Sequence, residues 1–225
     1  MQTKRRNRMI NTVLFDMDGL LLDTEPLWGE CMMRIAEKHG IPITGDRFKE
    51  TTGLRIYEVT EYWSVKYPWK GSTHSDVAEE ILDDIIETSK SRAGVLKGVV
   101  ETLELLKRYN FKIGLASSSP SRMINTLVAH FHLHHYFDCI TSADAVALGK
   151  PHPAVFLHCA ENLKSSPMQC VVLEDSVNGM IAGKAARMKV IVVPDALHFH
   201  DPKFALADKK LNSLEDFDLK VLDQL

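Results

Sequence analysis

Four short, mostly apolar runs, at residues 12–15, 112–116, 171–173 and 190–193, alternate along the chain with longer segments of helical periodicity. Strands that are apolar on both faces and separated by helices are typical of parallel sheets built from βαβ units. Between the runs, Ser119 followed by Pro120 is typical of an N-cap and a first helical residue, and Pro153 precedes an amphipathic segment. The pattern predicts an α/β fold with a parallel sheet.

The stretch from about residue 27 to residue 92 interrupts this alternation with helical periodicity and no convincing strand. Its apolar residues fall on three helical faces: Trp28, Met32 and Ile35; Ile56, Val59, Thr60 and Trp63; and Val77, Ile81 and Ile85. Pro26 precedes the stretch, and Gly94 and Gly98 follow it, which suits two flexible connections. We predict an inserted helical domain at residues 25–92 and a core formed by residues 1–24 and 93–225.

Composition narrows the classes of protein to consider. The 225 residues are 45% hydrophobic, enough to bury a full core, and a net charge of −3 does not favour binding to nucleic acid or to an anionic membrane. No apolar segment near the start has signal-peptide or membrane-spanning length. We expect a cytoplasmic monomer without nucleic-acid or membrane partners, and we interpret the basic residues near the start as a solvated tail: Lys4, Arg5, Arg6 and Arg8.

Asp16, Asp18 and Gly19 follow directly after the first apolar run. In an open parallel sheet the ligand crevice lies at the carboxyl ends of the strands, so both carboxylates would face it. One acid can attack phosphorus while the other handles the proton of the leaving group, and the glycine permits a sharp turn. An Asx turn that ends the strand is the alternative reading of the same residues.

Further polar residues follow the other predicted strands and a helix junction: Ser117, Ser118, Lys150, Glu174 and Asp175. Taken singly, the serines could cap a helix, the acids could favour a helix N-terminus, and the lysine could lie on the surface. Together they supply phosphate-binding hydroxyl and N–H groups, a cation, and carboxylate oxygens suited to magnesium. Their shared position at strand ends favours a phosphoryl-transfer site that takes a small phosphorylated substrate.

These residues form four motifs, DMDG at Asp16, LASSS at Ser117, KPHP at Lys150 and LEDSVNG at Glu174, which resemble the haloacid dehalogenase-like superfamily. The resemblance is to the branch with a helical cap after the first motif, and it implies a Rossmann-like parallel sheet core with an inserted α-helical cap. It also implies that Asp16 is the nucleophile, Asp18 the general acid and base, and Ser117 and Lys150 the phosphate-binding residues. Mg²⁺ would be held by Asp16, the Asp18 carbonyl oxygen and Asp175, with Glu174 as a direct or water-bridged ligand.

The same branch contains phosphatases and beta-phosphoglucomutase, and the cap distinguishes them. The position of a mutase histidine corresponds by residue counting to Trp28, which disfavours the mutase. Residues 25–28, 52–56 and 174–180 resemble phosphatases of hexitol phosphates and 2-deoxyglucose 6-phosphate. We expect Arg55 to reach the substrate and Trp28 to pack on a sugar face, although both could be structural. A mutase and a catalytically silent phosphosugar-binding module stay as alternatives.

The remaining conspicuous residues are interpreted as structural. The cysteines Cys31, Cys139, Cys159 and Cys170 lack metal-binding spacing and are expected to be small buried hydrophobic residues. In the cluster His130, His132, His134 and His135, two histidines four residues apart could share a helical face and bind a metal. A helix C-terminus, where histidines interact favourably with the dipole, is the preferred interpretation. No role is predicted for His198 and His200.

Overall fold

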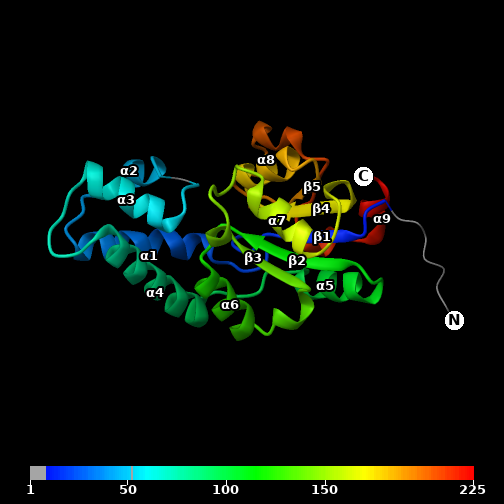
Figure 1. Ribbon diagram of the computed structural model, residues 1–225, viewed down its shortest axis with the longest axis horizontal. Coiled ribbons are helices and arrows are strands. Elements are labelled where there is room, and N and C mark those ends of the chain that lie inside the picture. Colours follow the sequence, from blue (N-terminus) through cyan, green and yellow to red (C-terminus); the bar gives the residue numbers. More distant parts are fainter. Residues whose placement is uncertain (1–8, 52) are drawn as a thin grey trace.

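The computed structural model describes residues 9–51 and 53–225, so the basic residues near the start and Thr52 lie outside the described part (Figure 1). It contains one six-stranded sheet in which neighbouring strands pair in parallel, confirming the predicted α/β class. The strands are β1 Thr12–Phe15, β2 Lys112–Ser117, β3 Cys139–Ser142, β4 Cys170–Glu174, β5 Lys189–Val192 and β6 Lys209–Lys210.

Helices cover both faces of the sheet, which explains why the strand sequences are apolar on both sides. In β1, Val13 and Phe15 belong to one buried cluster and Leu14 to another. The first cluster includes residues of α5 Val99–Arg108, α6 Ser121–His130 and α9 Leu219–Asp223; the second includes residues of α7 Ala154–Asn162 and α8 Val177–Ala185. Short 3₁₀ helices cover His134–Tyr136, Ala143–Ala145, Pro167–Gln169, Pro202–Leu206 and Leu214–Asp216.

Residues between β1 and α5 form four helices, which extend to one side of the sheet (Figure 1). They are α1 Glu25–Lys38, α2 Gly45–Lys49, α3 Ile56–Lys66 and α4 His74–Arg92. Their apolar faces meet in a third buried cluster around Trp63, which is fully buried. The predicted helical content of this stretch is therefore confirmed, and its apolar positions pack together as helical periodicity requires.

Three details differ from the sequence prediction. Strands β3 and β6 were not predicted, and α6 begins at Ser121 with Pro120 at the N-cap, whereas we expected Ser119 to cap a helix beginning at Pro120. The backbone of Pro120 is extended, with φ −59° and ψ 146°, so the helix cannot include it.

Among the described residues, no helix combines the length and apolar character needed to cross a membrane.

The strand order β3-β2-β1-β4-β5-β6 determines where a ligand crevice forms. The chain runs outward from β1 through β2 to β3, returns beside β1 at β4, and then runs outward on the opposite side. Such a reversal opens a crevice beyond the carboxyl ends of the two central strands. Asp16 follows β1 and Glu174 ends β4, so the topology places both acids at this crevice.

Candidate active site

A buried lysine joins the carboxylates at the ends of β1 and β4. Lys150 Nζ lies 2.5 Å from Asp16 Oδ1 and 2.6 Å from Glu174 Oε1, and it stands over the Phe156 ring at 4.7 Å from the centroid. Lys150 is 7% exposed, Asp16 6% and Glu174 0%. Burial would lower the pKa of Lys150, but the two carboxylates outweigh it and raise the pKa above its usual value. Lys150 is therefore a fixed cation.

Glu174 is held in place by the start of α8. Its Oε2 accepts hydrogen bonds from the backbone N–H of Asp175 and Ser176, both at 3.0 Å, and from Ser176 Oγ at 2.9 Å. Burial opposes ionisation, but Lys150 and the bonds from Ser176 outweigh it and lower the pKa of Glu174. A Cβ on Gly179 would lie 1.7 Å from Glu174 Oε1, so this helical position requires glycine.

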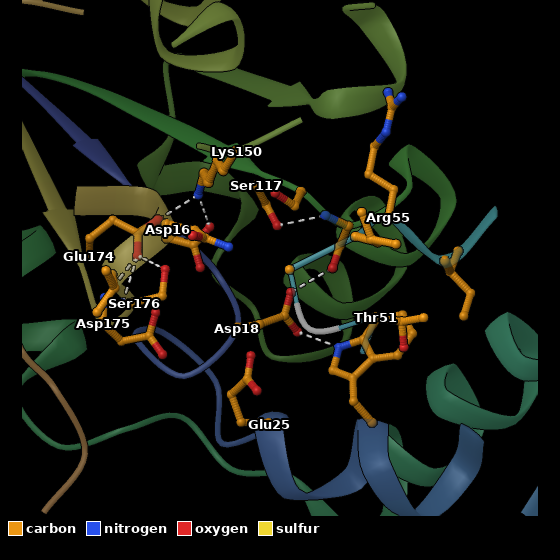
Figure 2. A pocket seen from close by; sticks show the side chains of 18 of the residues that line it. Asp16, Asp18, Glu25, Thr51, Arg55, Ser117, Lys150, Glu174, Asp175 and Ser176 are labelled. Atoms are coloured by element: carbon orange, nitrogen blue, oxygen red, sulfur yellow. Dashed lines mark hydrogen bonds and ion pairs between the residues drawn. The ribbon is translucent and has the colours of Figure 1, made fainter. Parts of the chain in front are cut away.

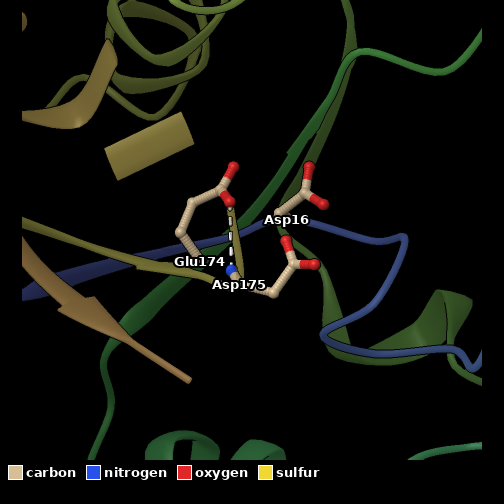
Figure 3. A group of neighbouring side chains, drawn as sticks. All are labelled: Asp16, Glu174 and Asp175. Carbon is tan, nitrogen blue, oxygen red and sulfur yellow. Dashed lines mark hydrogen bonds between the residues drawn. The ribbon is translucent and has the colours of Figure 1, made fainter. Parts of the chain in front are cut away.

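Asp16, Glu174 and Asp175 form a cluster in which one carboxylate oxygen from each lies within 4.8 Å of the others (Figure 3). Burial, followed by the neighbouring carboxylates, raises the pKa of Asp175 well above its usual value. Burial also raises the pKa of Asp16 well above its usual value, although the charge of Lys150 acts in the opposite direction. One lysine cannot balance three carboxylates. A hard divalent cation such as Mg²⁺ prefers an oxygen donor set of this kind, so the residues fit the expected metal.

Gly19 brings the loop after β1 against this cluster. Its φ is +73°, and a Cβ at this position would lie 2.2 Å from Asp175 Oδ2. Both the left-handed backbone and the lack of space require glycine. The predicted sharp turn is present, and in this structure it brings the backbone against an acidic side chain.

Asp18 points away from the cluster and is held by three donors (Figure 2). Thr24 Oγ1 donates to Asp18 Oδ1 at 2.6 Å, Trp28 Nε1 donates to the same oxygen at 3.2 Å, and Ser119 Oγ donates to Oδ2 at 2.6 Å. Asp18 is 8% exposed, so these bonds orient it firmly. Thr24 and Ser119 were not predicted as site residues; the available signals were the place of Ser119 within the LASSS motif and that of Thr24 shortly after the DMDG motif.

The side chains surround a cavity of about 780 Å³ between the sheet and the helical insert. Ser117 and Ser118 line it at the end of β2, as expected, and Ser117 Oγ accepts a hydrogen bond from Ser119 N–H at 3.0 Å. Trp28 also lines the cavity, from α1. The structure therefore places seven predicted residues of the core together around one space: Asp16, Asp18, Ser117, Ser118, Lys150, Glu174 and Asp175.

Glu25, at the start of α1, is a wall residue that the sequence analysis missed. Its side chain points toward Asp18 (Figure 2). Glu25 is exposed to solvent, but the protein atoms around its carboxyl group, followed by the negative charges of Asp18 and Glu174, raise its pKa to about 7. Glu25 is the first residue of the segment 25–28, whose resemblance to phosphatases of hexitol phosphates was the available signal.

Arg55 lines the cavity, but its guanidinium points away from Asp16 and Lys150 (Figure 2). It forms an ion pair with Glu58 at 2.6 Å and donates to the carbonyl oxygens of Ala143, Val146 and Ala147. The expectation that this group reaches the substrate does not agree with the arrangement seen here, because protein acceptors surround it.

The histidine cluster does not form the helical pair considered as a metal site. Helix α6 ends at His130, His132 has a positive φ of 57°, and His134 begins a separate 3₁₀ helix. His130 Nε2 instead lies 3.1 Å from the carbonyl oxygen of Lys90. Within residues 9–51 and 53–225, the acids Asp16, Glu174 and Asp175 are the group spaced to hold a metal ion. Of the cysteines, three are buried and Cys139 is partly exposed, and all are free thiols.

Comparison with known proteins agrees with this architecture. A 42% identical relative is hexitol phosphatase B of Escherichia coli, with 96% of this chain and 97% of the relative covered. A phosphorylated carbohydrates phosphatase of Thermotoga maritima is 32% identical, with 81% and 84% covered. The crystal structure of beta-phosphoglucomutase from Clostridium difficile superposes with a TM-score of 0.80 at 25% identity, covering 96% of each chain. The family model described as haloacid dehalogenase-like hydrolase matches residues 13–193, so this chain belongs to that family.

Proposed function

We propose that this protein is a magnesium-dependent phosphatase that hydrolyses a small sugar or polyol phosphate through an aspartyl-phosphate on Asp16. The observation that carries the proposal is the convergence of Asp16, Lys150, Glu174 and Asp175, which are far apart in sequence, at one edge of the sheet. The names of the relatives, which act on hexitol phosphates and phosphorylated carbohydrates, support the substrate class.

Asp16 is the proposed nucleophile. Lys150 holds its Oδ1 and stands ready to balance charge on the phosphoryl oxygens, while Ser117 and Ser118 lie where they can bind the same oxygens. An Asp16 carboxylate oxygen attacks phosphorus, the bond from phosphorus to the substrate oxygen breaks, and Asp18 gives a proton to that oxygen. Water then attacks the phosphoryl group, giving a proton to Asp18 and releasing phosphate and free Asp16.

Asp16, Asp175 and Glu174, with the Asp18 carbonyl oxygen, are the proposed ligands of Mg²⁺. Their shared charge and the raised pKa of Asp16 and Asp175 favour a cation at this point. When bound, Mg²⁺ supplies positive charge that offsets the repulsion between the phosphate and the acids. The three hydrogen bonds to Asp18 hold this proton-transferring carboxyl group away from the acidic cluster and nearer the insert.

The helices at residues 25–92 are the proposed cap over a core of residues 1–24 and 93–225. They form their own buried cluster, and they contribute Trp28, Thr51 and Gly53 to the cavity wall. A lid of this kind excludes bulk water from the reacting groups and selects substrates by shape. Trp28 then has two roles open to it: contact with the sugar and orientation of Asp18.

A beta-phosphoglucomutase is the second candidate, because proteins of that name share the fold and the helical insert. It would use the same aspartyl-phosphate and return the phosphoryl group to a sugar hydroxyl. An indole N–H on Asp18, as Trp28 supplies here, can orient the acid but cannot take up a proton. This feature favours the phosphatase.

The test is phosphate release from a panel of hexitol, sugar and nucleotide phosphates, with conversion of beta-glucose 1-phosphate to glucose 6-phosphate measured in parallel. We expect magnesium-dependent release from polyol or sugar phosphates and no isomerisation. Asp16→Asn should lose at least about a thousandfold in kcat, because the nucleophile is removed. Wild-type turnover in Asp16→Asn would contradict the mechanism, and isomerisation without release would establish the mutase.

A further inference from the structure

The guanidinium of Arg55 connects the start of α3 with the core. Its Nε and Nη2 donate to Glu58 Oε1 at 3.0 and 2.6 Å. Its Nη1 donates to the carbonyl oxygens of Ala143 and Val146, and Nη2 to that of Ala147, each at 3.1 Å. These bonds account for the five N–H donors of a guanidinium. Arg55 therefore donates all of its N–H groups to protein acceptors, which lie in both the insert and the core.

The segment that Arg55 holds leads directly into Lys150. Apart from the 3₁₀ helix Ala143–Ala145, residues 143–149 form no regular structure, and most of them are exposed. Gly149 lies against the Arg55 side chain, because a Cβ there would come within 3.2 Å of Arg55 Cγ. The next residue, Lys150, reaches Asp16 and Glu174. The position of the lysine therefore depends on a segment that is anchored from the insert.

A second arginine, Arg122, also bridges the insert and the core, but through exposed ion pairs and not through bonds to backbone carbonyl oxygens. Arg122 of α6 pairs with Glu79 and Asp83 of α4, with 48% of its side chain exposed. Exposed ion pairs of this type contribute little to the free energy of folding or docking. Arg55 has 22% of its side chain exposed and binds neutral backbone oxygens with a planar, charged fork, which fixes geometry more strictly. Arg55 is thus the better candidate for a contact that affects the site.

Close packing beside Arg55 supports the same docked arrangement. Gly53, two residues earlier, has a φ of +88°, and a Cβ there would lie 2.2 Å from Asn178 Nδ2 in the first turn of α8. The Gly53 contact thus lies beside the fourth motif, and the Arg55 contact lies beside Lys150. Both contacts lie on the wall of the same cavity.

We propose that Arg55 is a positioning residue that clasps residues 143–149 when the insert is docked and thereby fixes Lys150 against Asp16. The inference rests on the proposed function, since it concerns the same phosphoryl-transfer site. It assigns the guanidinium to the lysine-bearing segment and not to the substrate. Its loss should therefore slow the chemical step for any phosphate monoester, whether or not the substrate reaches the insert.

The test compares Arg55→Lys and Arg55→Ala with the wild type, measuring kcat and KM separately for a hexitol phosphate and for p-nitrophenyl phosphate. We expect kcat to fall about 10- to 100-fold with both substrates, because a displaced lysine no longer aligns the reacting groups. Arg55 itself makes no contact with the substrate, so any change in KM caused by the displaced Lys150 should be similar for the two substrates. Lysine keeps the charge but offers three donors, so Arg55→Lys should fall as well. Amide hydrogen exchange should become faster at residues 143–149 in both variants.

Arg34→Ala is the matched control, because Arg34 pairs with Asp84 within the insert, between α1 and α4. It should keep kcat near the wild-type value. An equal loss in Arg34→Ala would attribute the effect to general weakening of the insert and overturn the proposal.

Other outcomes separate this inference from the proposed function. A rise in KM for the hexitol phosphate alone, full rescue by Arg55→Lys, or unchanged kinetics in both Arg55 variants would show that Arg55 does not position Lys150. The phosphatase function would survive each of these results. It would fail instead if the wild type released no phosphate from any monoester with Mg²⁺ present.

Discussion

Trp28→Phe tests whether the insert orients Asp18. The substitution keeps an aromatic ring at the cavity wall and removes the indole N–H that donates to Asp18 Oδ1 at 3.2 Å. Thr24 and Ser119 retain their own bonds to the carboxylate, so Asp18 loses one of three donors. We therefore expect Asp18 to remain near its place with its orientation less firmly held.

The size of the effect follows from the kind of bond. A hydrogen bond to a charged acceptor contributes about 1.5–3 kcal/mol, and the 3.2 Å separation places this one at the lower end. A loss of about 1.4 kcal/mol corresponds to about tenfold in rate. Only substrates whose leaving group needs a proton should show this loss. An alkoxide leaving from a hexitol phosphate needs one, whereas p-nitrophenolate is stable without it.

The assay is kcat/KM for both substrates in the wild type and in Trp28→Phe. We expect a loss of about tenfold for the hexitol phosphate and less than about twofold for p-nitrophenyl phosphate. Equal losses for the two substrates would refute the reasoning, because proton transfer would then not be the step affected. A higher KM for the hexitol phosphate at unchanged kcat would show that the indole serves to bind the sugar.

Trp63→Phe is the control for the loss of indole volume. Trp63 is fully buried in the insert, and its N–H has no hydrogen-bond partner among the described residues. The smaller ring should lower the free energy of unfolding by about 1–3 kcal/mol while leaving the ratio of the two kcat/KM values unchanged.

Three further predictions concern stability. Gly29→Ala should raise the free energy of unfolding, measured by urea titration, by up to about 1 kcal/mol, since the space around this α1 residue is open. Gly179→Ala should lower the free energy of unfolding and abolish activity, because the added methyl group displaces Glu174. Asp175→Asn should stabilise the metal-free protein by about 1 kcal/mol or more and remove the stabilisation by Mg²⁺, because the pKa of Asp175 is raised in the folded state. In the wild type with chelator, Asp16 and Asp175 bind protons more tightly in the folded state than in the unfolded chain, because their pKa values are raised on folding. The free energy of unfolding should therefore fall as the pH rises above the usual aspartate range. A flat profile of unfolding free energy against pH would contradict this.

The sequence alone determined four strands of the sheet and the acidic centre of the site. Strands β1, β2, β4 and β5 are apolar on both faces, and such runs leave few alternatives to a central strand. Because parallel strands end at one edge, residues just after them, such as Asp16 and Asp175, had to meet there. Strand β6 consists of two partly exposed lysines, so it had no apolar signal to reveal it.

Only the tertiary structure decided what the side chains at the boundary of the insert contact. The carbonyl oxygens that bind Arg55 lie 88, 91 and 92 residues further along the chain, and Ser119 reaches Asp18 across 101 residues. Hydrophobic periodicity reports which face of an element is buried, but the partner of a long polar side chain depends on how separate elements dock. For that reason the motifs revealed the acids and the lysine, while the orientation of Trp28 and Arg55 emerged only from the folded chain.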